Sequence, residues 1–228
     1  EDEPELCAAI NAKAPAILAR ETERLGVPLL HVSTDYVFSG DLDRPYREDD
    51  PTGPINIYGR TKLEGEQAIA AKNPSHVIIR ASWIVSAYRN NFIKTMLKLA
   101  TDRDTLRVID DQIGGPTSAD DLASALLTII DRYRTNKALA AGVFHFSNQG
   151  EASWADLAEA VMLSAKALGG VHAEIERIST SEYPTKARRP RNSRLNSEKI
   201  RKTYGILARN WHDAVFEIVT KLGGRVER

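Results

Sequence analysis

Tyr58 and Lys62 lie four positions apart in a predicted helix, so their side chains project from one face. A free tyrosine phenol titrates near ~10 and is a poor acid–base catalyst at neutral pH. A nearby ammonium stabilises the phenolate and lowers that pKa. The pair could therefore act as a general acid for a ketone that receives hydride on carbon. The same spacing also occurs on ordinary exposed amphipathic helices, so the pair alone does not identify an active site.

Three polar residues, Ser33, Thr34 and Asp35, follow the short apolar run 29–32, which reads as a buried parallel strand. Open α/β sheets bind ligands beyond the carboxyl ends of their strands. A hydroxyl at this place can donate a hydrogen bond to a substrate oxygen. The alternative is a turn in which these side chains satisfy local backbone groups.

Helical and strand patterns alternate along the chain, which predicts an α/β fold built on a parallel sheet. The expected strands are 29–32, 77–81, 108–109, 143–146 and 175–178, and the expected helices are 5–25, 57–71, 91–101, 117–133, 154–168 and 211–222. Pro15 could kink or break the first helix. Ser153 is expected to cap the helix at 154–168, and Asn196 or Ser197 a short later helix. A basic loop is expected over 179–194.

Composition excludes several classes of function. The 228 residues hold 31 Lys and Arg against 31 Asp and Glu, which gives no reason to expect nucleic acid or an anionic membrane as a general partner. Cys7 is the only cysteine, so an intrachain disulfide and a cysteine zinc cluster are impossible, as suits a reducing cytoplasm. No apolar run approaches the ~18 residues of a membrane helix. The acidic start without methionine is unlike a signal peptide, and we expect the chain to begin inside a longer gene product.

Five segments carry a resemblance to a known family. They read S-T-D-Y-V-F at 33–38, P-x-N-x-Y-G-x-T-K-x-E-G-E at 54–66, N-N-F at 90–92, D-Q-x-G-x-P-T at 111–117 and R-P-x-N-S-x-L at 189–195. In this order, over essentially the whole chain, they resemble the extended short-chain dehydrogenase/reductases. Within that superfamily they are most similar to the dTDP-4-dehydrorhamnose reductases.

The resemblance implies a Rossmann-type NAD(P)-binding parallel sheet, with its N-terminal part missing, and a smaller C-terminal α/β substrate domain. It assigns 1–83 and 116–148 to the dinucleotide-binding domain, and 84–115 and 149–228 mainly to the substrate domain. It implies NADPH- or NADH-dependent reduction of the C4 ketone of dTDP-4-dehydro-β-L-rhamnose, a step towards cell-surface polysaccharide such as lipopolysaccharide. The partner would be a nucleotide sugar, and the protein a monomer or homodimer. Some members use Mg²⁺, but no carboxylate motif here requires it.

The same resemblance assigns roles to individual residues. Tyr58 would be the proton donor, and Lys62 would lower its pKa and hydrogen-bond the nicotinamide ribose. Thr34 would hydrogen-bond the C4 carbonyl oxygen of the sugar. Asp35 would lie beside Thr34 and contact the sugar, and Val32 would line the nicotinamide site, through its backbone.

Further substrate contacts are implied at three places, each with a purely structural alternative. Trp83 would touch the substrate, or would be a core or interface tryptophan. Asn90 and Asn91 precede the helix at 91–101, whose N-terminus suits a diphosphate, although ordinary N-capping explains them too. Arg189 belongs to a basic cluster that could hold the diphosphate or form a solvated loop. That cluster comprises Lys186, Arg188, Arg189, Arg191 and Arg194.

The chain departs from the family in one respect. It contains no G-x-G or G-x-x-G, the motif that seats the dinucleotide pyrophosphate. The comparison suggests that roughly 70 residues of the cofactor domain are missing. We therefore expect a polypeptide that truly starts at Glu1 to bind NAD(P)H poorly, and the choice between NADH and NADPH stays open.

Two other functions compete with reduction. An epimerase or dehydratase of the same superfamily would keep its cofactor through a cycle and consume no NAD(P)H. A non-catalytic regulatory subunit would have no need of Tyr58, Lys62 and Thr34. A hydrolase has little support, since no G-x-S-x-G elbow is present.

Overall fold

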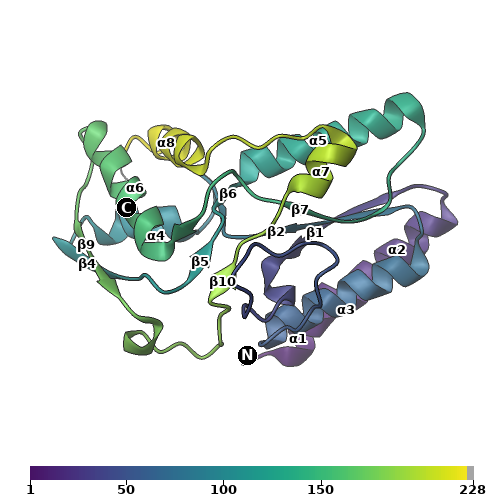
Figure 1. Cartoon of the computed structure of the whole chain (residues 1–228), viewed down its shortest axis with the longest axis horizontal. Coiled ribbons are helices and arrows are strands. Elements are labelled where there is room, and N and C mark those ends of the chain that lie inside the picture. The colour runs from purple at the N-terminus through teal and green to yellow at the C-terminus, as the bar shows by residue number, and fades with distance from the viewer. Residues whose placement is uncertain (225–228) are drawn as a thin grey trace. The chain divides into compact units, whose positions relative to one another are not determined.

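The computed structural model describes residues 1–224, which form two compact units (Figure 1). The first unit contains Glu1–Ser82, Ala123–Phe146 and Thr185–Leu207. The second contains Trp83–Leu122, Ser147–Pro184 and the segment that begins at Ala208. None of the helices within residues 1–224 is both long enough and apolar enough to cross a membrane.

The first unit is organised by a three-stranded parallel sheet of order β1-β2-β7. β1 is Leu29–Thr34, β2 is His76–Ala81 and β7 is Gly142–Phe146. Thr34 pairs with Ala81, and Ala81 in turn with Phe146, so the carboxyl ends of all three strands lie at one edge of the sheet. Every residue of β2 is buried, as expected for the central strand of a parallel sheet covered on both faces.

Helices α2 (Ala14–Arg24) and α3 (Ile57–Lys72) lie along one another in this unit (Figure 1). Ile69 of α3 meets Ala19 of α2 and Ile78 of β2 in a fully buried cluster. Glu66 of α3 and Arg80 of β2 form a buried ion pair of 2.6 Å between Oε2 and Nη2. These contacts fix the long axis of α3 on the sheet.

The predicted helix at 5–25 is present in three consecutive pieces. α1 (Pro4–Ala8) leads into a π-helical turn, η1 (Ala9–Lys13), and then into α2. Pro15 has no N–H to donate to the carbonyl of Asn11, so the regular hydrogen-bond ladder cannot continue there. The interruption expected from Pro15 thus takes the form of a π turn.

The second unit holds short strands and three helices around an apolar core. β3 (Ile84–Val85) pairs with β6 (Thr117–Ser118), and β4 (Thr105–Ile109) with β9 (Glu174–Ile178), both in parallel. β5 (Ile113–Gly114) is antiparallel to β8 (Ala152–Ser153). The helices are α4 (Phe92–Leu99), α6 (Trp154–Ala167) and α8 (Trp211–Lys221).

Caps begin the helices where the sequence indicates. Ser153 starts α6 with a capping box: its Oγ accepts from the N–H of Asp156 at 3.0 Å, and Asp156 Oδ2 accepts from the N–H of Ser153 at 2.8 Å. At α7 (Glu198–Tyr204) the side chain that caps is Asn196, whose Oδ1 accepts from the N–H of Glu198 at 2.9 Å. Ser197 makes no such bond.

The division predicted from the sequence differs from the structural one at two segments. Residues 185–207 belong to the first unit, because the N–H of Tyr46 donates to the carbonyl of Arg194 and Lys199 Nζ donates to the carbonyl of Val143. Residues 116–122 belong to the second unit, where the N–H of Thr117 donates to the carbonyl of Trp83.

The remaining elements refine the predicted boundaries. α5 runs over Ala119–Asn136, three residues beyond the expected end at 133. The basic loop expected over 179–194 contains a 3₁₀ turn, η3 (Thr180–Glu182), and the short strand β10 (Asn192–Ser193).

Candidate active site

The carboxyl end of β1 and the first turn of α3 meet through backbone contact. Thr34 ends β1 and caps a 3₁₀ turn, η2 (Asp35–Val37), where its Oγ1 accepts from the N–H of Tyr36 at 3.1 Å. Asn56 starts α3 and accepts from the N–H of Gly59 at 2.8 Å. A Cβ on Gly59 would lie 2.0 Å from the carbonyl oxygen of Tyr36, so only glycine permits this approach.

Tyr58 is brought to Thr34 by this packing, and the Thr34 hydroxyl is one of the groups that act on the Tyr58 phenol. The Tyr58 ring meets the Tyr36 ring edge-on, with centroids 5.8 Å apart at 76°. The residue is 45% exposed, so a ligand can reach the ring. Burial raises the pKa of the Tyr58 phenol above its ordinary value, the Thr34 hydroxyl opposes this, and the Asp35 charge adds to it.

Lys62 lies one turn further along α3 and reaches back to β1. Its Nζ donates to the carbonyl oxygen of Val32 at 2.7 Å and lies 3.3 Å from Nε2 of His31. Because an ammonium can only donate, Nε2 of His31 must be the acceptor. Burial lowers the pKa of Lys62, against the Glu66 charge, and burial together with the Lys62 charge lowers the pKa of His31 to about 4. His31 is therefore neutral at pH 7.

The role of Lys62 in lowering the pKa of Tyr58 stays a prediction. Lys62 is engaged by the backbone of β1, and the pKa of Tyr58 is raised rather than lowered, with burial as its largest cause. The two side chains still share one face of α3 at the carboxyl end of β1.

Asp35 is almost completely buried, with 4% exposure. Its Oδ1 accepts from Thr34 Oγ1 at 3.1 Å. Burial raises the pKa of Asp35 to about 6, although hydrogen bonds with Ser193 and Thr34 lower it. Within residues 1–224, Oδ2 of Asp35 and Oγ of Ser33 are buried without a hydrogen-bond partner.

Comparison with known proteins decides the family. Residues 1–223 match the model described as the RmlD substrate binding domain. A dTDP-4-dehydrorhamnose reductase of Sinorhizobium fredii is 47% identical over 223 residues, which cover 97% of this chain and 75% of the relative. The chain belongs to the RmlD substrate binding domain family.

Solved structures of this family share the fold. A dTDP-4-dehydrorhamnose reductase from Clostridium acetobutylicum superposes with a TM-score of 0.89 at 36% identity. Another from Bacillus anthracis, solved in complex with NADP, gives 0.87 at 32%. Both alignments cover 97% of this chain and 75% of the other. The predicted α/β Rossmann-type fold is confirmed.

Two predicted substrate contacts on the second unit have structural roles there. Trp83 is 8% exposed, stacks on Trp154 with centroids 3.6 Å apart, and packs against Gly114. Asn91 caps α4, since its Oδ1 accepts from the N–H of Ile93 at 3.1 Å. Asn90 is exposed beside it. In the structure Trp83 is thus a core residue and Asn91 is a helix cap. Contact of Trp83, Asn90 and Asn91 with the substrate stays a prediction.

Arg189 of the basic segment acts electrostatically on Tyr36, next to the predicted site. The backbone carbonyl oxygen of the preceding residue, Arg188, accepts a hydrogen bond from Asn56 Nδ2 at 2.8 Å. This bond connects the basic segment to the start of α3. The Arg189 charge acts on Tyr36, whose pKa burial nevertheless raises to about 12. Lys186 pairs with Asp2 on the surface at 2.9 Å.

Two residues of the site received no role from the sequence. Tyr36 packs on Tyr58, and Ser193 is a neighbour that lowers the pKa of Asp35. Tyr36 lies in the family-like segment 33–38 and Ser193 in the segment 189–195. Their membership of these motifs was the one sequence signal that could have indicated a role. Periodicity could not reveal either, because both contacts join parts of the chain that are distant in sequence.

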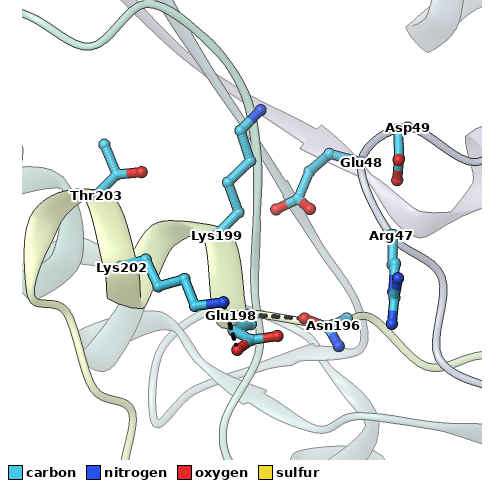
Figure 2. A pocket seen from close by; sticks show the side chains of 8 residues that line it. All are labelled: Arg47, Glu48, Asp49, Asn196, Glu198, Lys199, Lys202 and Thr203. Atoms are coloured by element: carbon cyan, nitrogen blue, oxygen red, sulfur yellow. Dashed lines mark hydrogen bonds and ion pairs between the residues drawn. The ribbon is translucent and has the colours of Figure 1, made fainter.

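A cavity of about 360 Å³ in the first unit lies elsewhere and contains none of the predicted site residues (Figure 2). It lies between the loop at 47–49 and α7 and is lined by Arg47, Glu48, Asp49, Asn196, Glu198, Lys199, Lys202 and Thr203. Glu48 accepts from the N–H of His145, while Lys199 donates to the carbonyl of Val143. These two side chains cover the open edge of β7. Among the described residues, no group of three or more His, Cys, Asp or Glu could hold a metal ion.

Proposed function

We propose that this protein reduces the C4 ketone of dTDP-4-dehydro-β-L-rhamnose to dTDP-β-L-rhamnose, with NADPH or NADH as reductant. The reaction would take place in the cytoplasm, and its product would be a precursor of cell-surface polysaccharide. The observation that carries the proposal is the convergence of Thr34 and Tyr58 at the carboxyl end of β1, with Lys62 one turn further along α3. Relatives that share the family and up to 47% identity bear this reductase name.

The chemistry follows from the positions of these groups. The ketone oxygen would lie against the hydroxyls of Thr34 and Tyr58. Thr34 would hydrogen-bond the oxygen and hold it, and Tyr58 Oη–H would protonate it as negative charge develops there. Asp35 and Arg189, the latter beside Tyr36, are proposed to contact the sugar and its diphosphate. Trp83, Asn90 and Asn91 stay predicted substrate contacts.

The nicotinamide end of the cofactor fits the residues present. Lys62 offers an ammonium, already held by the Val32 carbonyl, from which a ribose hydroxyl could accept. NAD(P)H, when bound, supplies the hydride that reduces C4. The sequence 1–228 contains no glycine motif for the pyrophosphate, so we derive no role for these residues at that end.

The test is consumption of NADPH or NADH in the presence of the dTDP-4-keto sugar, with wild type and Tyr58→Phe compared. Tyr58→Phe should fold normally and lose reduction. Tyr133→Phe is a matched control, since Tyr133 also precedes a lysine by four residues, and Lys137 Nζ lies 5.8 Å from its ring centroid. That variant should keep the wild-type rate.

The same assay separates the competing functions. Net loss of NAD(P)H supports reduction, whereas sugar conversion without net loss indicates an epimerase or dehydratase. Binding of a partner enzyme without any conversion indicates a regulatory subunit. An unchanged rate in Tyr58→Phe would remove this tyrosine from its assigned role.

A further inference from the structure

We propose that His31 is a positioning residue for Lys62: its neutral imidazole and the Val32 carbonyl each accept one N–H of the ammonium, which leaves the third N–H for the cofactor. The proposal rests on the proposed function, because it concerns the lysine assigned there to the nicotinamide ribose. It is carried by the two hydrogen bonds of Lys62 Nζ, the place of His31 on β1 and the surroundings of the imidazole.

Two of the three N–H groups of Lys62 are already engaged. An ammonium has three donors and no acceptor. Nζ donates to the carbonyl oxygen of Val32 at 2.7 Å and lies 3.3 Å from Nε2 of His31. One N–H therefore remains for a further acceptor. Because the bonds around an ammonium nitrogen are tetrahedral, the two engaged N–H groups fix the direction of the third.

A single anchor would not fix this side chain. Lysine carries its charge on a flexible four-carbon stem. A bond to the Val32 carbonyl alone would let the ammonium rotate about the line between its nitrogen and that oxygen. The imidazole of His31 supplies a second acceptor, and rotation then breaks one of the two bonds.

Both acceptors belong to one rigid element. His31 and Val32 are consecutive in β1, and all six residues of this strand pair with β2. Consecutive side chains of a strand point to opposite faces. One ammonium can nevertheless reach both residues, since His31 offers its side chain and Val32 its backbone oxygen. The position of the ammonium is therefore set by β1, the strand that also carries Thr34.

The imidazole must be neutral to accept, and its surroundings keep it so. A protonated imidazole only donates, and it would repel Lys62. Burial and the Lys62 charge lower the pKa of His31 to about 4. The carboxylate of Glu66, one turn further along α3, is held by Arg80 of β2 in the buried ion pair. Helix α2, which also packs on β1, presents the apolar Ala19 to the sheet.

The first test needs no cofactor and uses ¹⁵N-labelled histidine in the whole chain. His31→Gln assigns the His31 signals by their loss. In wild type at neutral pH, the ¹⁵N shifts should show a proton on Nδ1 and none on Nε2. Lys62→Met should raise the His31 pKa towards its ordinary value of 6.5, because it removes the cation and the bond to the neutral imidazole.

Lys72→Met is the matched control, since Lys72 is exposed in the last turn of the same helix. It should leave the His31 titration unchanged. A proton on Nε2 of His31 in wild type, or a His31 pKa that Lys62→Met leaves unchanged, overturns the proposal.

The second test is the KM for NADPH or NADH in the reduction assay. His31→Leu removes the acceptor, and this KM should rise about tenfold, which corresponds to one hydrogen bond of a charged group. The KM for the sugar should not change. His31→Gln keeps an oxygen that can accept, and it should retain most of the cofactor affinity.

Equal loss in His31→Leu and His31→Gln would indicate a packing role alone and would overturn the proposal, as would a wild-type KM in His31→Leu. If the wild-type chain consumes no NAD(P)H, the proposed function fails. The histidine titration then still decides whether His31 holds Lys62.

Discussion

Gly59→Ala should destabilise the protein although alanine normally strengthens a helix. A Cβ at this position would lie 2.0 Å from the carbonyl oxygen of Tyr36, against the 3.4 Å at which ordinary contact begins. The first turn of α3 or η2 must therefore move by about 1.4 Å, the difference between the two distances. Alanine gains ~1 kcal/mol over glycine in a helix interior. Overpacking costs about 1–3 kcal/mol and should outweigh that gain, because backbone and not a flexible side chain stands in the way.

Gly65→Ala offers a matched comparison on the same helix. Its Cβ would lie 2.1 Å from the carbonyl oxygen of Asn11 in η1, so the steric cost should be similar. The two variants should differ in catalysis. Gly59 adjoins Tyr58, and a misplacement of ~1 Å at reacting groups can cost ~100-fold in rate. Gly65 meets η1, away from Thr34, and its variant should keep most of the activity.

Urea unfolding followed by tryptophan fluorescence gives the stability of both variants, and NAD(P)H consumption gives their rates. The reasoning is refuted if Gly59→Ala is more stable than wild type. It is also refuted if the two variants lose activity equally, because the loss would then reflect general damage to α3 and not displacement of Tyr58 from Thr34.

Three further predictions concern stability. Burial lowers the pKa of His145 to about 3, so as pH falls below 6.5 the unfolded chain binds a proton at this residue before the folded chain does. The free energy of unfolding of wild type should therefore fall by about 2 kcal/mol between pH 6.5 and 4.5. His145→Asn should flatten this part of the plot of unfolding free energy against pH, measured by denaturant titration. Glu66→Leu should cost about 3–5 kcal/mol by leaving Arg80 buried and unpaired, while Glu66→Leu with Arg80→Met should recover most of it in denaturant titrations. Ser153→Ala should cost ~1 kcal/mol in thermal unfolding, through loss of the α6 cap.

The sequence predicted the elements whose signals are local. The helix of Tyr58 and Lys62, the cap at Ser153 and the apolar strand before Thr34 all depend on neighbours within one or two turns. Residues 185–207 lie in the first unit through contacts such as the pairing of Leu195 with Tyr46, far away in sequence. No local pattern encodes such a contact.

The candidate site shows the same limit. Its residue types were predictable from motifs, but their electrostatics were not. The raised pKa values of Asp35 and Tyr58 follow from burial by η2, α3 and the segment that carries Ser193. The bond from Lys62 to the Val32 carbonyl likewise depends on how α3 lies against β1. Spacing places two side chains on one face of a helix, but packing decides which partner each of them finds.

The raised pKa of Tyr58 bears on the direction of the chemistry. A base that begins a reaction by removing a proton needs a phenol that ionises near neutral pH, and therefore a lowered pKa. A proton donor must hold its proton until negative charge develops on the substrate oxygen, and it too works best with a pKa near the operating pH. Burial and the Asp35 charge both keep the Tyr58 phenol protonated, and the Thr34 hydroxyl is the one neighbour that opposes them. Reduction of the ketone therefore needs a neighbour that lowers the Tyr58 pKa, and Lys62, one turn further along α3, is the residue proposed for that role.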